Sequence, residues 1–287
     1  MNLRMLGVLI GVACAAMPPV MLRADNQVMQ LQSLTPVAQL SQTLKIAEIL
    51  AVMRDEGLSH SAEMEANLFP GQGGAAWQTI VAQIYDLEKL QALFDVALEK
   101  SLTENTETTA DIAAFFGSDL GQRVISLEIE ARRTLLDDVA EAAAAKAWGQ
   151  LQDDKSPRVG QIDRFAKLND LIESNVMGAM NANLAFYRGM ADAGAFNAQM
   201  TEEQMLADVW GQEPDLRKET VDWLFPFLAL AYQPLSDDDL DAYIVFSESN
   251  AGKQANAAIF AAFDAVFLKI SNQLGHAAAR IMAGQNI

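Results

Sequence analysis

The sequence predicts an all-α protein, a helical bundle of about nine to eleven helices built from two tandem repeats of a helix-corner-helix unit. Apolar residues recur at the i, i+3, i+4, i+7 spacing of a helix in almost every segment after the N-terminus. No segment alternates convincingly with the two-residue period of a strand, and clusters of β-branched residues are scarce. Hydrophobic residues make up 51% of the chain and charged residues 20%, which is typical of a globular protein.

The N-terminus predicts export. Residues 1–4 are basic, residues 6–16 are apolar and uncharged, and a polar segment begins near Arg23. This pattern is typical of a signal peptide, expected to span residues 1–24, with cleavage after Ala15 or Ala24. An uncleaved anchor is the alternative, and lipidation of Cys14 is less favoured because the residues before it, Gly11-Val12-Ala13, lack the usual leucine. We therefore expect a periplasmic or secreted protein.

The mature chain is expected to form two helical repeats, residues 25–155 and 156–287. An alanine-rich helix ends near Trp148 and is followed by the charged, proline-containing linker 153–157. Apolar stripes predict helices over 80–98 and over about 250–282. Gly57 is a plausible helix stop. No later stretch reaches about 18 uninterrupted apolar residues, so no membrane span is expected in the mature chain.

A nine-residue pattern occurs twice, at 115–123 and at 246–254, with one constant offset of 131 residues. In both copies a serine is suited to cap the next helix, and a glycine falls in the first turn of that helix. Glycine costs about 1 kcal/mol in helix propensity, so we expect the preceding helix to approach it closely, with the phenylalanine packed across the missing side chain. The motif residues are Phe115, Ser118, Gly121, Phe246, Ser249 and Gly252. Their expected role is structural.

The second copy resembles a known family. Leu235-Ser236-Asp237-Asp238-Asp239-Leu240, then Tyr243, Phe246, Ser249, Gly252 and Lys253, is similar to the pattern L-[ST]-x-x-E-L … F-Y-x-S-P-x-G-[KQR] of a secreted bacterial family called domain of unknown function twenty fifty-nine. The resemblance is best over 235–282 and weaker over 102–148. The family's proline is Asp119 or Asn250 here. The resemblance implies an exported, all-helical protein and implies no reaction, so it supplies no catalytic residues.

Composition excludes several function classes. The chain has 287 residues, with 38 acidic against 20 basic side chains and a net charge of −18, which disfavours nucleic acid as a partner. One cysteine excludes an internal disulfide, and two histidines leave little for a zinc site. His60 and His276 lie in different halves.

Other charged sets are also expected to be structural. Asp237, Asp239, Asp241 and Glu248 have calcium-loop spacing, but Ala242 stands where the loop requires glycine. The glycine-rich segment 71–76 has no preceding strand to form a phosphate site. The charged residues of one helix, Glu128, Glu130, Arg132 and Arg133, are predicted to form a solvated face with salt-bridge spacing. We expect no cofactor and no metal.

The aromatic stretch from Trp210 to Tyr232 has two interpretations. It is either a core helix, kinked at Pro226, or one wall of an apolar groove for a lipid tail or peptide. The candidate groove residues are Trp223, Phe227 and Tyr232.

Together these features predict an exported, non-catalytic helical protein that binds or scaffolds an envelope protein or lipid. A periplasmic lipid- or peptide-binding carrier is the first alternative. An envelope hydrolase using Asp137 and Asp138 is the second, disfavoured because adjacent carboxylates point to different sides of a helix. The oligomeric state stays open.

Overall fold

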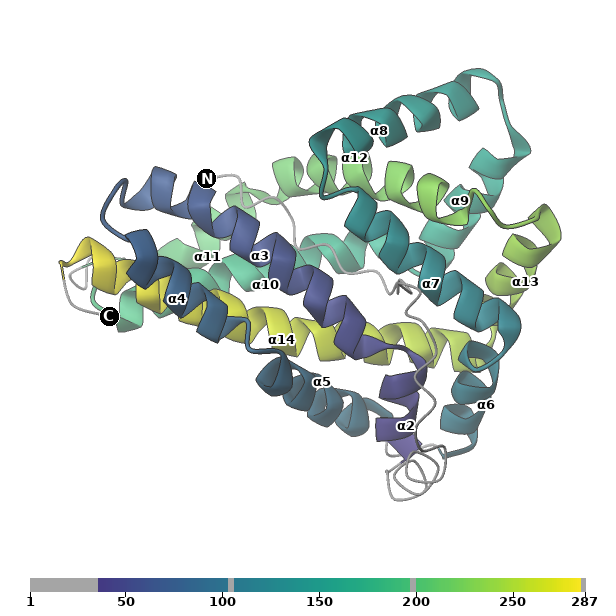
Figure 1. Ribbon diagram of the computed structural model, residues 1–287, viewed down its shortest axis with the longest axis horizontal. Helices are drawn as coiled ribbons and strands as arrows, with labels where there is room; N and C mark the ends of the chain where they lie inside the picture. Colours follow the sequence, from purple (N-terminus) through teal and green to yellow (C-terminus); the bar gives the residue numbers. More distant parts are fainter. Residues whose placement is uncertain (1–35, 103–105, 197–199, 285–287) are drawn as a thin grey trace, which may run out of the picture.

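A computed structural model describes residues 36–102, 106–196 and 200–284, and every regular element in these ranges is a helix (Figure 1). The all-α prediction is confirmed. The predicted signal peptide 1–24, its two cleavage sites and Cys14 lie outside the described ranges.

The chain is divided into more helices than the nine to eleven predicted. The first half contains α2 (Pro36–Thr43), α3 (Ile46–Leu68), α4 (Gly74–Ile84), α5 (Leu87–Leu102), α6 (Thr106–Phe116), α7 (Asp119–Thr134) and α8 (Asp138–Asp153). The second half contains α9 (Pro157–Leu168), α10 (Leu171–Asp192), α11 (Glu202–Gly211), α12 (Glu213–Tyr232), α13 (Asp237–Glu248) and α14 (Asn250–Met282).

Two helix boundaries differ from the prediction for local reasons. Gly57 does not end a helix but lies buried inside α3, where the ring of Tyr85 packs against it. A side chain larger than that of glycine does not fit there, because a Cβ would come 2.1 Å from Cζ of Tyr85. The apolar stripe over 80–98 is split between α4 and α5 at Tyr85 and Asp86. The carboxylate of Asp86 accepts a hydrogen bond from the backbone N–H of Lys89 at 3.0 Å, which starts a new helix there.

Each half begins with a helix pair broken in the same way. Lys45 separates α2 from α3 with φ 52° and ψ 39°, and Asp170 separates α9 from α10 with φ 50° and ψ 37°. A left-handed residue cannot continue a right-handed helix, so each pair bends at this point. The predicted linker is a third such break, where Lys155 has φ 51° and Ser156 caps α9.

The two predicted corners have matching geometry. Ser118 Oγ accepts from the N–H of Gly121 at 3.1 Å, and Ser249 Oγ accepts from the N–H of Gly252 at 3.0 Å. A Cβ at either glycine would come 2.2 Å from a backbone oxygen of the preceding helix, at Phe115 or Phe246. The close approach therefore involves backbone, not the phenylalanine rings as predicted.

Those two rings instead join the corners to each other. The rings of Phe115 and Phe246 stack with their centroids 3.7 Å apart and their planes 2° from parallel. The halves also exchange helix contacts, because α7 packs on α12 and α14 packs on α5. One continuous hydrophobic cluster takes buried residues from both halves, so the halves share a core.

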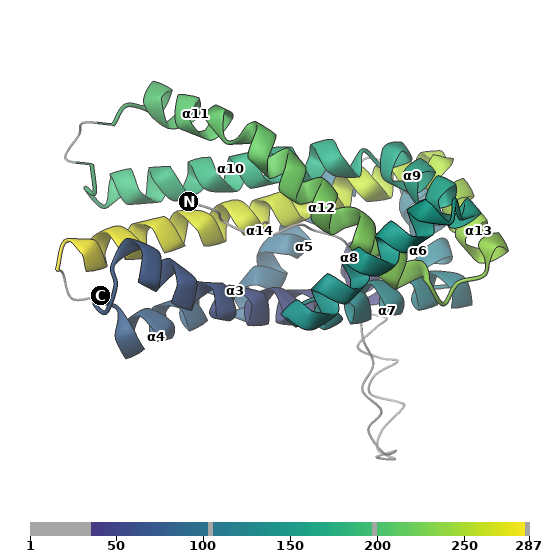
Figure 2. The ribbon, with the colours of Figure 1, turned by 90° about the horizontal axis from the view of Figure 1, so that it is seen from above.

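Helix α14 runs through the middle of the molecule. Figure 2 shows α10, α11 and α12 on one side of it and α3 and α4 on the other, and α10 is the helix it packs against most extensively. With 33 residues it is long and apolar enough to cross a membrane by length and composition alone, but half of its most apolar window is buried in the fold. A core helix of a bundle has the same composition.

Candidate functional site

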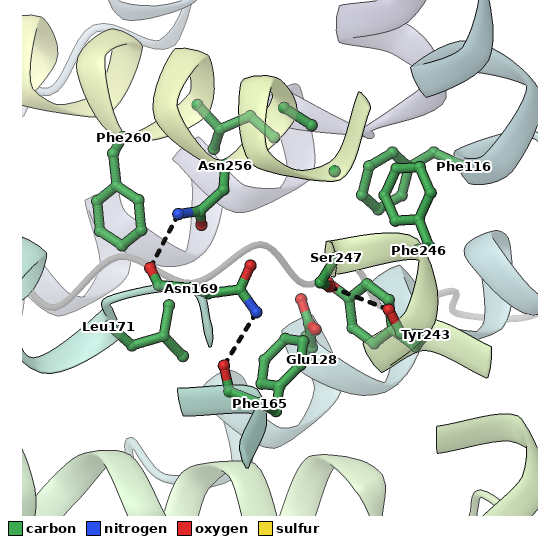
Figure 3. Close-up of a pocket in the computed structure, with 13 residues that line it drawn as sticks. Phe116, Glu128, Phe165, Asn169, Leu171, Tyr243, Phe246, Ser247, Asn256 and Phe260 are labelled. Atoms are coloured by element: carbon green, nitrogen blue, oxygen red, sulfur yellow. Dashed lines mark hydrogen bonds between the residues drawn. The ribbon is translucent and has the colours of Figure 1, made fainter. Parts of the chain in front are cut away.

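A small pocket lies where the α9–α10 break meets the α13–α14 corner (Figure 3). Its volume is about 40 Å³. Since one water-sized group needs roughly 10–15 Å³ of such space, the pocket holds about three of them. The lining residues are Phe116, Glu128, Phe165, Asn169, Leu171, Tyr243, Phe246, Ser247, Gly252, Ala255, Asn256, Ile259 and Phe260.

The backbone breaks described above place the polar side chains of this pocket. Asn169 is the C-cap of α9, just before left-handed Asp170, and its Nδ2 donates to the carbonyl oxygen of Phe165 at 3.0 Å. Asn256, in the second turn of α14, donates its Nδ2 to the carbonyl oxygen of Asn169 at 2.9 Å. These two bonds tie α14 to the end of α9.

The hydrogen bonds also define what the pocket offers to a ligand. Because both amide nitrogens donate to backbone carbonyls, the amide oxygens of Asn169 and Asn256 remain to accept. Ser247 Oγ donates to the carbonyl oxygen of Tyr243 at 3.0 Å, so it too presents lone pairs. The wall is therefore rich in acceptors and is otherwise aromatic.

Glu128 on α7 is the charged or chargeable group of the pocket. It is 1% exposed, and its Oε1 accepts from the hydroxyl of Tyr232 at 2.6 Å. Figure 3 shows its carboxyl pointing between Asn169 and Ser247. Burial raises the pKa of Glu128 to about 8, while hydrogen bonds from Tyr232 and Tyr243 act in the opposite direction. The carboxyl is therefore mostly neutral at pH 7.

The two tyrosines are held as hydrogen-bond donors. Burial, followed by the nearby carboxyl of Glu128, raises the pKa of Tyr232 and that of Tyr243 well above the ordinary value. Both phenols therefore keep their protons at neutral pH. Glu128 is the member of this cluster that titrates.

Burial of Glu128 overturns the predicted solvated face of α7. Glu130 and Arg133 are exposed as expected, but Glu128 and Arg132 are 1% and 3% exposed. Arg132 Nε and Nη2 each donate to the carboxylate of Glu56 on α3 at 2.7 Å. The buried stripe of α7 runs through Val124 and Ile125, and the helical period from these residues reaches both 128 and 132, which is the signal the sequence contained.

The predicted groove residues do not line the pocket. Phe227 and Tyr232 are fully buried in the core, and Trp223 stacks on Phe227 with ring centroids 4.8 Å apart. Helix α12 continues past Pro226. Of the three, Tyr232 reaches the pocket through its hydrogen bond to Glu128, a role that the sequence did not indicate.

The acidic residues singled out in the sequence lie at helix N-termini or form ion pairs. Asp237 and Asp239 begin α13 and pair with Arg158 and Arg123. Asp137 caps α8 by accepting from the N–H of Ala140 at 2.9 Å. Within the described ranges no group of three or more His, Cys, Asp and Glu side chains is placed to hold a metal ion.

Comparison with known proteins finds a family that matches one segment of the chain. Residues 88–148 match the family described as uncharacterized protein conserved in bacteria, DUF2059. This confirms the resemblance predicted from the sequence. The match spans about a fifth of the chain and falls on the first corner, not on 235–282, where the motif letters fit better. The DUF2059 segment contains Glu128. No curated protein and no solved structure matches the chain.

Proposed function

We propose that this chain is an exported, non-catalytic protein of the bacterial envelope that binds a small polar ligand in the pocket above Glu128. The observation that carries the proposal is the buried carboxyl, held by Tyr232 and facing a space bordered by the amide oxygens of Asn169 and Asn256. Burying an ionisable group has a cost in stability that packing alone does not require. The bacterial family and the composition of residues 1–24 support export.

Binding is favoured over catalysis by the kind of groups in the pocket. Acid–base catalysis usually places two titratable groups of different pKa around the reacting bond. Here the hydrogen-bonding partners of Glu128 are two phenols that keep their protons. One titrating carboxyl among amide oxygens and aromatic rings is suited to recognition.

A carrier of lipid tails receives less support. Sites for molecules of drug or lipid size usually enclose about 300–1,000 Å³, several times the volume of this pocket. The other candidate surface, around Trp223, is packed by its own neighbours. We also propose that the mature chain has no membrane span, because α14 is the central helix of the bundle.

Expression of the full chain from its native N-terminus tests this proposal. We expect the protein in the periplasmic fraction, with an intact mass that shows removal of an N-terminal segment. Native mass spectrometry should then detect a small bound molecule that is absent from a Glu128→Gln variant and present in a Glu130→Gln control. Retention in the cytoplasm would contradict export. A ligand-free chain, or a ligand that survives Glu128→Gln, would contradict binding at this pocket.

A further inference from the structure

The residues that line the pocket indicate which chemical group it can bind. The side-chain oxygens that line the space belong to Glu128, Asn169, Ser247 and Asn256, and all four can accept from a ligand once Glu128 is ionised and the bonds within the protein are made. An ammonium group has three N–H donors and no acceptor. An anionic ligand would bring further acceptors and leave these oxygens without a donor.

We propose that the pocket binds the primary ammonium group of a small ligand, which enters as Glu128 releases its proton. This rests on the proposed binding function and specifies its ligand class. One cation enters and one proton leaves to solvent, so the charge buried in the pocket does not change. The ammonium then forms an ion pair with the carboxylate and donates to the two amide oxygens.

The walls and the mouth fit such a ligand. Aromatic rings, those of Phe116, Tyr243 and Phe246 among them, line the space, and ring faces attract cations. Asn256, Phe246 and Phe260 are only partly buried, so part of the pocket wall borders solvent and leaves a path for an alkyl chain. Magnesium or calcium takes six or more oxygen ligands, waters included, and a pocket of about 40 Å³ with one carboxyl does not have room for that shell.

Charge around the pocket is compatible with a cation. The charged residues next to lining residues in the sequence are Arg164, Asp170, Glu248 and Lys253, and all four are exposed. Arg164 is neutralised by Glu248, with Nη2 2.6 Å from Oε1. Arg132, one turn beyond Glu128, is paired with Glu56. The excess of 38 acidic over 20 basic side chains attracts cations to the whole surface.

Calorimetric titration of the mature protein with methylammonium chloride, against sodium chloride at equal ionic strength, tests the proposal. Because Glu128 has a pKa of about 8, binding at pH 7 should release about 0.9 proton, measured by repeating the titration in buffers of different ionisation enthalpy. The affinity should rise about tenfold between pH 7 and pH 9, where the carboxyl is already ionised. Equal affinity at the two pH values, or no proton release, would overturn the proposal.

Three variants separate the ammonium site from general charge effects. Glu128→Gln has the shape of the neutral carboxyl and should fold but lose methylammonium binding. Glu130→Gln removes an exposed carboxylate from the same helix and should bind as the parent does. Asn256→Ala removes one acceptor oxygen without changing the charge and should weaken binding. Binding that survives Glu128→Gln, or that is unchanged in Asn256→Ala, contradicts an ammonium site.

Acetamide, a neutral molecule of similar size, distinguishes failure of this inference from failure of the binding function. If acetamide binds in a way that depends on Glu128 and methylammonium does not, the pocket binds ligands but the ammonium assignment is wrong. If neither binds and the purified protein carries no ligand, both proposals are wrong.

Discussion

The two halves of the molecule use the same corner but fill the space beneath it differently. With the offset of 131 residues, the buried residues Ile112, Phe116 and Ile125 of the first half correspond to Tyr243, Ser247 and Asn256 of the second. Just before the left-handed breaks, buried Leu44 corresponds to Asn169. Beneath the first corner Leu44, Ile112 and Ile125 form apolar core, whereas beneath the second their counterparts line the pocket, together with Phe116 of the first half.

At other positions the first half is polar where the second half is apolar. On α7, Glu128 and Arg132 are buried and polar, while the corresponding residues on α14 are the apolar Ile259 and Phe263. The pocket of the second half thus receives its carboxyl from the first half. This difference fits the proposal that the polar residues, not the corner, bind the ligand.

A large effect is expected where the halves are alike. Alanine at Gly121 or at Gly252 would place Cβ 2.2 Å from a backbone oxygen, so each substitution should lower the free energy of unfolding by about 2–3 kcal/mol. Gly149→Ala, in α8 with nothing within 4 Å, should instead stabilise the protein by about 0.5–1 kcal/mol. Urea unfolding measures all three. A mild effect at one corner and a severe one at the other would break the comparison.

The buried ion pair of the first half should behave differently from an apolar contact. Arg132→Met leaves the carboxylate of Glu56 without its partner and should cost about 3 kcal/mol of stability. Replacing both residues, with Glu56→Leu added, should recover most of that loss. If the double variant is as unstable as the single one, the unpaired carboxylate of Glu56 is not the cause of the lost stability.

Stability should depend on pH through Glu128. Its pKa is about 8 in the folded chain, against 4.5 for an ordinary glutamate, so the folded state holds the proton more tightly. The stability that the protonated carboxyl of Glu128 contributes is fully present below pH 4.5 and is lost as the pH rises to about 8. Between these values the free energy of unfolding should fall by up to about 1.4 kcal/mol per pH unit. Glu128→Gln should flatten this slope in urea unfolding between pH 5 and 8, whereas Glu130→Gln should leave it unchanged.

The last change makes the second half resemble the first. Asn256→Ile introduces the residue found at the corresponding position, Ile125, and leaves the carbonyl oxygen of Asn169 without its donor. We expect the free energy of unfolding to fall by about 1–2 kcal/mol, together with loss of methylammonium binding. A variant that still binds with parental affinity would remove Asn256 from the site.

The features predicted from sequence are those set by neighbouring residues. Helical periodicity gave the fold class, and the spacing of Ser118 and Ser249 from their glycines predicted two capped corners that the structure contains. Burial of Glu128 was missed because its hydrogen-bond partner Tyr232 is 104 residues away. The pocket was missed for the same reason, since its polar groups come from α7, α9 and α14 and meet only after packing.

The titration of Glu128 tests the central claim most directly. Carbon-13 NMR of the carboxyl group, assigned by comparison with Glu128→Gln, should show a midpoint near pH 8 that moves to lower pH when methylammonium is added. A midpoint near the ordinary value of 4.5, unchanged by methylammonium, would show that this carboxyl is neither held neutral by burial nor part of an ammonium site.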